Sequence, residues 1–195
     1  SKNYFLSTFI FITMHFYIFL FSGLRQAIAY SIIWISLKYI KERKLLKFLA
    51  LVLIATTFHK TAIIFLPVYF LSNKKLTHKY LIIFLIVILM TFIFKLQIFN
   101  IITKLVYGNY AAIQNGGGYK LLLLLIIIFV GSLYILYKKN NKEEQEQNNI
   151  WLNMLLIGIL VQTLASIEGN IARLTMYFEY SIIFLIPNKK DKNIS

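Results

Sequence analysis

The 195-residue sequence contains no cysteine, and acidic residues are scarce. The lack of cysteine excludes disulfides, thiolate metal sites and cysteine nucleophiles. Asp and Glu together number 7 against 21 Lys and Arg, and the one aspartate, Asp191, lies in the basic C-terminal tail. The sequence therefore has no aspartate pair that could hold a divalent metal on a nucleotide sugar. We expect neither a metal site nor a cofactor.

Several catalytic signatures are absent as well. The sequence has no HExxH, CxxC, GxSxG or GxGxxG motif and no Walker lysine loop. These motifs place metal ligands, nucleophiles or phosphate-binding backbone, so their absence removes support for hydrolase, ATPase and dehydrogenase functions.

Long apolar stretches dominate what is present. Hydrophobic residues make up 59% of the chain and charged residues 14%, against about 45 to 50% and about 25% in soluble domains. A bilayer crossing needs about 20 apolar residues, with about 17 tolerated. Five stretches reach this length and a sixth, the last, is short: Tyr4–Phe21, Leu24–Ile40, Tyr80–Ile102, Leu121–Tyr137, Ile150–Ile167 and Leu174–Pro187. They lack the alternation of a membrane barrel. The sequence predicts one all-α, polytopic membrane domain over residues 1–195, with about six transmembrane helices, as the C-terminal part of a longer chain.

The net charge of +14 would suggest nucleic acid as the partner of a soluble protein. Here the basic residues gather in short loops between apolar stretches, where they orient helices and contact lipid head groups. We therefore expect membrane lipid, and no nucleic acid, as a partner.

The segment Phe48–Leu71 decides the topology. If it enters the membrane and returns as a broken or re-entrant hairpin, the four lysine-rich loops fall on one side, as the positive-inside rule favours. The polar stretch Thr56–Thr61 offers a place for the turn. This topology makes residues 138–149 a cytoplasmic loop and residues 103–119 an external loop.

Scarce cations on the external side are candidate ligands for a lipid diphosphate. They are Arg25, followed by Gln26, then Lys60 and Arg173. Arginine offers a planar fork of donors that suits phosphate. The alternative is that the arginines lie at helix ends with their charged groups in the head-group layer.

Three residues are candidate bases. His59 lies in the middle of an apolar run beside a lysine, where an ionisable group is costly and usually functional, and a neutral imidazole accepts a proton from an attacking hydroxyl. The alternative is a structural histidine that holds the turn. Glu168 and Glu179 could serve as base or pair with Arg173, whereas His15 is expected to be a core histidine.

The external loop combines Tyr107 with amides and three glycines at positions 116–118. Aromatic faces suit sugar rings, and glycine permits close backbone approach. A plain flexible connector is the alternative.

Four motifs together resemble one family. They are SGLRQAIA at 22–29, IATTFHKTA at 54–62 followed by Leu66-Pro67, the triple glycine, and Ala172-Arg173-Leu174 with Tyr177-Phe178. In order and spacing, from about Tyr4 to Pro187, the chain resembles the EpsG family of bacterial exopolysaccharide and capsule proteins, which are Wzy-type polymerases.

The resemblance implies a GT-C-like membrane glycosyltransferase of the bacterial cytoplasmic membrane. It implies polymerisation of undecaprenyl-diphosphate-linked oligosaccharide repeat units at the outer face. Our mechanistic hypothesis is metal-independent, inverting glycosyl transfer, and action alone or beside a chain-length regulator and other assembly proteins stays open. Arg25, His59 and Arg173 match the family's polar positions, and Tyr177 is expected at the substrate. The alternatives are a flippase of lipid-linked oligosaccharide, a membrane acyltransferase and a non-catalytic assembly subunit.

Overall fold

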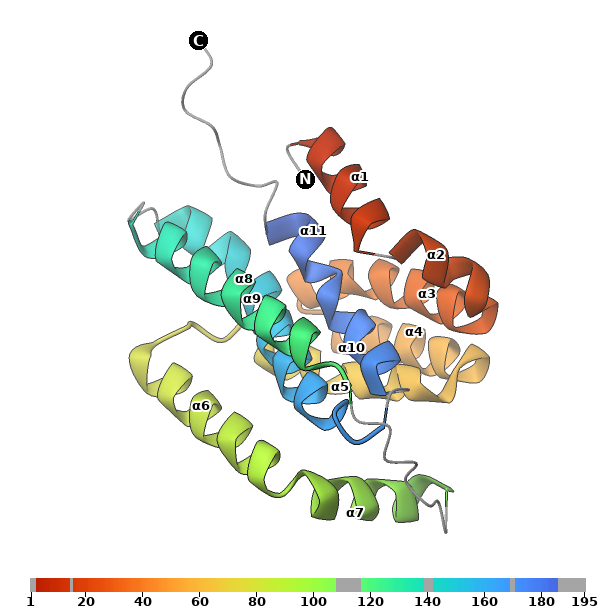
Figure 1. Ribbon diagram of the computed structural model, residues 1–195. Helices are drawn as coiled ribbons and strands as arrows, with labels where there is room; N and C mark the ends of the chain where they lie inside the picture. Colours follow the sequence, from red (N-terminus) through yellow and green to blue (C-terminus); the bar gives the residue numbers. More distant parts are fainter. Residues whose placement is uncertain (1–2, 15, 108–116, 139–141, 169–170, 186–195) are drawn as a thin grey trace. The chain divides into compact units, whose positions relative to one another are not determined.

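The computed structural model describes residues 3–14, 16–107, 117–138, 142–168 and 171–185. Every secondary-structure element in these ranges is helical (Figure 1), so the predicted all-α class is confirmed for them. The chain divides into two compact units, residues 1–74 with 180–195 and residues 75–179. Each unit is described by itself.

The first unit is built around an antiparallel helix pair. Its elements are α1 (Tyr4–Thr13), α2 (Phe16–Ser22), α3 (Leu24–Lys41), α4 (Leu45–Phe58), the 3-10 helix η1 (Lys60–Phe65), α5 (Leu66–Leu71) and α11 (Ser181–Leu185). A three-residue turn joins α3 to α4, which pack side by side (Figure 1). Arg43 adopts φ 57° in this turn, a left-handed conformation that favours glycine. The Lys44 ammonium donates to Glu42 at 2.7 Å beside it.

The apolar segment 48–71 breaks at its centre. The helix α4 ends at Phe58, and His59 is extended (φ −148°, ψ 111°) before η1 begins. The chain then returns along α4, because the rings of Phe48 and Tyr69 lie 5.1 Å apart. The break and the return agree with the predicted hairpin, whereas its entry into a membrane stays a prediction.

Aromatic rings form the core of the first unit. The Tyr180 ring contacts those of Phe16 at 4.3 Å, Trp34 at 4.6 Å and Tyr30 at 5.6 Å. Rings at these separations stabilise beyond their buried area. Tyr180 therefore attaches the chain's C-terminal part to α2 and α3.

The second unit surrounds one central helix. It contains α6 (His78–Ile93), α7 (Lys95–Tyr107), α8 (Tyr119–Lys138), α9 (Lys142–Leu164) and α10 (Ile171–Glu179). The helix α9 packs against α6, α8 and α10. At Gly158 the absent side chain permits close packing, since an added Cβ would lie 3.0 Å from the Cβ of Phe178.

The apolar stretches differ from the six expected spans. Among the described residues, α8 alone is long and apolar enough to cross a membrane as one helix. The stretch Tyr80–Ile102 is divided, since α6 and residues 95–101 of α7 meet at 81°. The stretches at 4–21 and 174–187 are also divided, each into two short helices.

The predicted loop at 138–149 is also mostly helical, because α9 begins at Lys142. Glutamates at positions 143, 144 and 146 favour the start of a helix, where negative charge complements the helix dipole. The Gln145 side chain further attaches this first part of α9 to α8 by donating to the Leu136 carbonyl at 3.2 Å.

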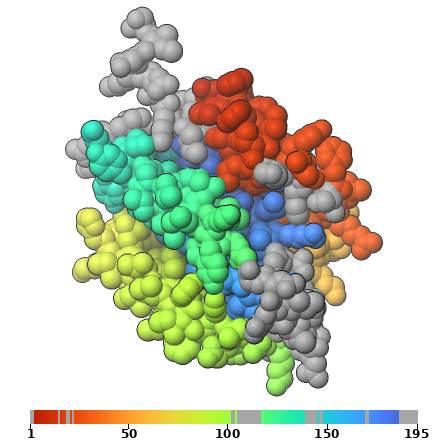
Figure 2. Space-filling view, viewed as in Figure 1, coloured from red at the N-terminus to blue at the C-terminus, as the bar shows by residue number. Residues whose placement is uncertain are grey.

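Large apolar side chains are exposed along α6 and α8, two helices that lie on the face of the molecule seen in Figure 2. Ile83 is 61% exposed, Leu123 60% and Ile127 58%. Soluble monomers rarely expose contiguous apolar patches of this kind, which are typical of contact with lipid or another protein.

Candidate functional site

Lys95 is the polar centre of one end of the second unit. It is the first residue of α7 and follows the bend with α6 directly. Its ammonium donates to the Ser166 hydroxyl at 3.0 Å and to the Tyr119 hydroxyl at 3.1 Å. It also lies 5.0 Å from the centre of the Phe92 ring. The lysine thus connects the start of α7, the start of α8 and the end of α9.

The surroundings of this ammonium leave it able to bind an anion. An ammonium has three donors, and hydroxyl groups of described residues occupy two. Neither ion pair in the described part of the chain involves Lys95. A cation held by hydroxyls and aromatic faces keeps its full charge for a ligand.

A buried amide network supports the same end. Gln162 is 1% exposed; its Nε2 donates to the Gly118 carbonyl at 3.0 Å, and its Oε1 accepts from the Thr175 hydroxyl at 2.8 Å. Gly118 has φ 90°, a conformation that side chains disfavour. One side chain therefore connects the glycine loop, α9 and α10.

The connector from α9 to α10 places two predicted residues at this end. Glu168 follows Ser166 by two positions, and its carbonyl accepts from the Ile171 N–H at 3.0 Å. Arg173 lies in the first turn of α10 and is exposed. Lys95, Glu168 and Arg173 thus all lie where α8 begins and α9 ends.

The other predicted residues of the second unit lie deeper or outside the described side chains. Tyr177 and Glu179 on α10 are 1% and 3% exposed. Oε1 of Glu179 has no hydrogen-bond partner among the described residues, and the described part of the chain shows no ion pair between Glu179 and Arg173. Tyr107 ends α7; its side chain and most of the 103–119 loop lie outside the described residues.

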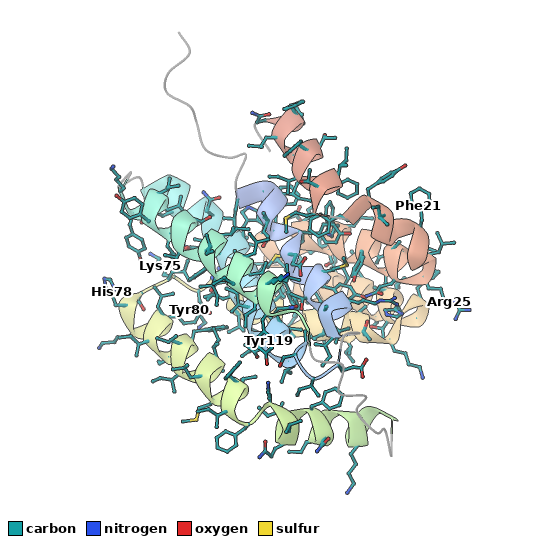
Figure 3. The ribbon with its side chains drawn as sticks, viewed as in Figure 1. Phe21, Arg25, Lys75, His78, Tyr80 and Tyr119 are labelled. Carbon is teal, nitrogen blue, oxygen red and sulfur yellow. The ribbon has the colours of Figure 1, made fainter. Side chains whose placement is uncertain are left out.

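In the first unit, Arg25 and the His59-Lys60 pair share one end of the α3–α4 pair. Because the two helices are antiparallel neighbours, the first turn of α3 lies beside the last turn of α4. Arg25 is exposed and points away from α3 (Figure 3), and Lys60 is exposed as the first residue of η1. His59 is half-buried at the break.

Gln26 differs from its neighbour, because it is 4% exposed. Its Nε2 donates to the Tyr30 hydroxyl at 2.6 Å, so in this structure it supports the aromatic core. His15, expected in a core, lies outside the described residues.

Comparison with known proteins gives one family. A model of the EpsG family matches residues 1–193 of the 195. The chain belongs to the EpsG family. No curated protein and no solved structure matches the chain. EpsG membership indicates a membrane-associated protein with a general role in polysaccharide polymerisation.

Lys95 of this EpsG chain was missed by sequence reasoning. It lies inside the apolar stretch Tyr80–Ile102, which we interpreted as one continuous span. The sequence did contain one indication of this site: an ionisable residue inside an apolar run is usually functional or paired. The same argument identified His59, where polar neighbours made the interruption visible.

The arrangement at the Lys95 end can hold a phosphate-bearing group. Lys95 and Arg173 supply positive charge, the Tyr119 hydroxyl supplies a further donor, and the exposed glycines 117 and 118 permit close approach. Preorganised donors of this kind stabilise charge that develops on a leaving oxygen.

Proposed function

We propose that this EpsG chain polymerises oligosaccharide repeat units that are carried on undecaprenyl diphosphate, at the outer face of the cytoplasmic membrane. The family match over residues 1–193 carries the proposal. The polar end of the second unit supports it, because Lys95 and Arg173 are cations suited to a diphosphate.

The proposed step is an inverting displacement. A hydroxyl oxygen of the incoming unit attacks the anomeric carbon of the growing chain. The bond from that carbon to the diphosphate oxygen breaks, and the diphosphate leaves with the electron pair. The hydroxyl proton passes to a base on the protein, so atoms and charge balance without a metal or cofactor.

The second unit supplies candidates for these roles. Lys95 and Arg173 would neutralise the departing diphosphate, while Glu168 lies on the connector at the same end and is a candidate base. Glu179, although buried, is the second candidate. Tyr107 and Tyr177 remain candidates for sugar contact.

The first unit has its own candidates, which need separate tests. Arg25 and Lys60 are exposed cations at one end of the α3–α4 pair, with Gln26 behind Arg25. His59 is a candidate base, because it lies half-buried at the helix break and a neutral imidazole accepts a proton from a hydroxyl.

The test uses proteoliposomes that contain the full-length protein and purified undecaprenyl-diphosphate repeat units, with products followed on a gel. Lys95→Met keeps a long side chain and removes the charge; Lys104→Met makes the same change at an exposed position of α7. We expect the wild type to form a ladder of polymer products on the gel, and metal chelators should not prevent it. The rate of polymer formation should be unchanged in Lys104→Met and about 100-fold lower in Lys95→Met, which is the loss typical of one oxyanion donor. Equal ladders in both variants would remove Lys95 from the site.

Arg173→Ala tests the second cation in the same assay. Polymer growth should fall at an unchanged protein level, since the exposed side chain is not part of the core. Undiminished polymer length in this variant would exclude Arg173 from the proposed site.

A flippase is the second candidate, and one observation favours it. Transporters place discontinuous helices at their binding sites, and the bend between α6 and α7 is a further break besides the one at His59. Repeat units that change leaflet without forming a ladder would favour transport over polymerisation.

A further inference from the structure

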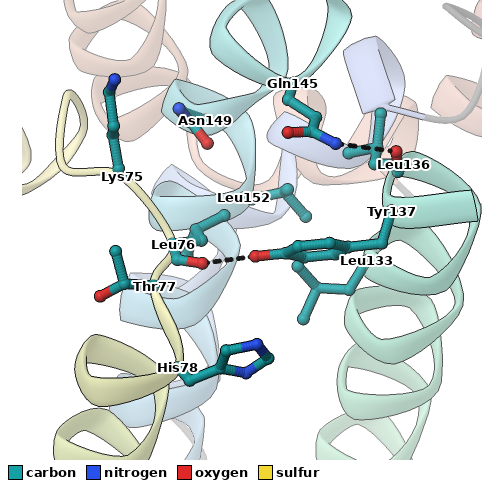
Figure 4. Close-up of a pocket in the computed structure, with 10 residues that line it drawn as sticks. All are labelled: Lys75, Leu76, Thr77, His78, Leu133, Leu136, Tyr137, Gln145, Asn149 and Leu152. Atoms are coloured by element: carbon teal, nitrogen blue, oxygen red, sulfur yellow. Dashed lines mark hydrogen bonds between the residues drawn. The ribbon is translucent and has the colours of Figure 1, made fainter. Parts of the chain in front are cut away.

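A cavity of about 450 Å³ (Figure 4) lies at the end of the second unit where Lys75 and His78 are found, opposite the end with Tyr119 and Lys95 (Figure 3). Three segments form its walls: the stretch that leads into α6, the last turns of α8 and the first half of α9. Ten residues line it: Lys75, Leu76, Thr77, His78, Leu133, Leu136, Tyr137, Gln145, Asn149 and Leu152.

Two hydrogen bonds hold these walls together. The Tyr137 hydroxyl donates to the Leu76 carbonyl at 2.6 Å, joining α8 to the stretch before α6. The Gln145 amide donates to the Leu136 carbonyl at 3.2 Å, joining α9 to α8 (Figure 4). The cavity is therefore a built feature of the unit, and its volume lies in the range of about 300 to 1,000 Å³ typical of ligand sites.

The lining has an apolar part and a basic, polar part. Four leucines form the apolar part, and Lys75 and His78 lie among hydroxyl and amide groups in the polar part. None of the ten lining residues is acidic. Thr77 caps the start of α6, where the first N–H groups add positive partial charge to the rim. Such a lining suits an amphiphile with an anionic head group.

The position of the cavity favours a membrane lipid as its ligand. Tyr137 lies 18 residues beyond Tyr119 on α8, which corresponds to about 27 Å along the axis, close to the hydrocarbon thickness of about 30 Å. The cavity and the Lys95 cluster thus lie at opposite ends of a span-length helix. At this end the segments 75–79 and 138–146 contain five lysines against three glutamates, and an excess of lysine is typical of the cytoplasmic side.

The neighbouring helix surfaces offer room for acyl chains. Tyr134 on α8 is 65% exposed and Ile82 on α6 58%, so apolar surface extends from the cavity along both helices. A soluble phosphate compound would leave this surface unused. Basic cavities between helices at the cytoplasmic side are known to bind anionic lipid head groups.

We infer that this cavity binds the phosphate head group of an anionic glycerophospholipid from the cytoplasmic leaflet. Lys75 provides the charge, and Thr77, His78 and Asn149 provide polar contacts to the phosphate and glycerol oxygens. The acyl chains lie along the exposed leucine and isoleucine side chains of α6 and α8. This site is separate from the proposed transferase site, so either can fail without the other.

The experiment measures tightly retained lipid. Full-length protein is reconstituted in vesicles of equal phosphatidylglycerol and phosphatidylcholine and purified in detergent, and its bound lipids are quantified by mass spectrometry. Lys75→Gln removes the lining charge, and Lys79→Gln makes the same change at an exposed residue outside the lining. We expect phosphatidylglycerol enrichment in the wild type and in Lys79→Gln, and about a fivefold loss in Lys75→Gln.

A second variant and a soluble competitor sharpen the result. Asn149→Asp places a negative charge in the lining and should also lower the enrichment. Glycerol phosphate at millimolar concentration should leave the enrichment unchanged; displacement would identify a soluble ligand instead and overturn the inference. Equal retention of both lipids, or the same loss in Lys75→Gln and Lys79→Gln, would also overturn it.

Discussion

Replacing Gly118 by alanine tests the network that shapes the Lys95 end of the second unit. Gly118 has φ 90°, and a Cβ added there would lie 2.7 Å from Nε2 of Gln162. Below about 3 Å one of the two groups has to move. Because Gln162 is 1% exposed and bonded on both sides of its amide, its displacement breaks hydrogen bonds that water does not replace.

The expected cost has two parts. Holding alanine at a positive φ costs about 1 to 2 kcal/mol. Leaving a buried amide or carbonyl without its partner costs about 1 to 3 kcal/mol. Partial relaxation makes these parts overlap, so we expect Gly118→Ala to lower the free energy of unfolding by about 2 to 4 kcal/mol.

The neighbouring glycine is a matched control. A Cβ at Gly117 would meet nothing within 4 Å, and its φ lies outside the disfavoured range. Chemical unfolding of both variants in the same detergent micelles, followed by circular dichroism, gives the comparison. Gly117→Ala should lie within about 0.5 kcal/mol of the wild type. Equal stability of the two variants would refute the argument that the Gln162 network depends on a bare backbone at position 118.

Two further predictions use the same unfolding measurement. Gly158→Ala should destabilise the protein by about 1 kcal/mol despite alanine's higher helix propensity, because the new Cβ meets the buried Phe178 at 3.0 Å. Gly131→Ala on α8 is the control: its Cβ meets nothing within 4 Å, so it should stabilise the protein by up to about 1 kcal/mol. The reverse order of stability would contradict close packing of α9 on α10. Arg43→Gly should stabilise the protein by about 0.5 to 1 kcal/mol, because φ 57° suits glycine. Arg43→Ala removes the same charge but keeps the backbone strain, so it should not stabilise the protein. A gain in stability in both variants would assign the effect to the loss of charge.

The helical class and the break at His59 could be predicted because each has a local cause. Unbroken leucine and isoleucine runs exclude strands with two faces, and the polar stretch at 56–61 interrupts its run visibly. The start of α9 could not be predicted in this way. Residues 142–149 have a loop-like composition, and their helix is held by a contact between Gln145 and the Leu136 carbonyl that no local pattern reveals.

The residues of the candidate site also differ in how far the sequence could predict them. Arg173 and Glu168 were predicted from their residue types at the end of an apolar run, and the structure places them at one end of the second unit. Gln26 and Tyr177 have equally suitable chemistry, but the structure buries them, because an amide or a phenol can also serve in packing. Residue type alone does not distinguish these two uses.

Lys95 shows why the break between α6 and α7 was not visible in the sequence. The stretch 80–102 has the composition of one span, and a single lysine in it could extend toward a membrane surface without disturbing the helix. In the structure its ammonium instead contacts Ser166, which is 71 positions away, and Tyr119, which is 24 positions away. Tyr119 begins α8, and Ser166 lies in the turn that follows α9. The bend between α6 and α7 is 81°. Lys95 follows this bend directly and pairs with hydroxyls that are distant in the sequence, and only a tertiary structure shows that pairing.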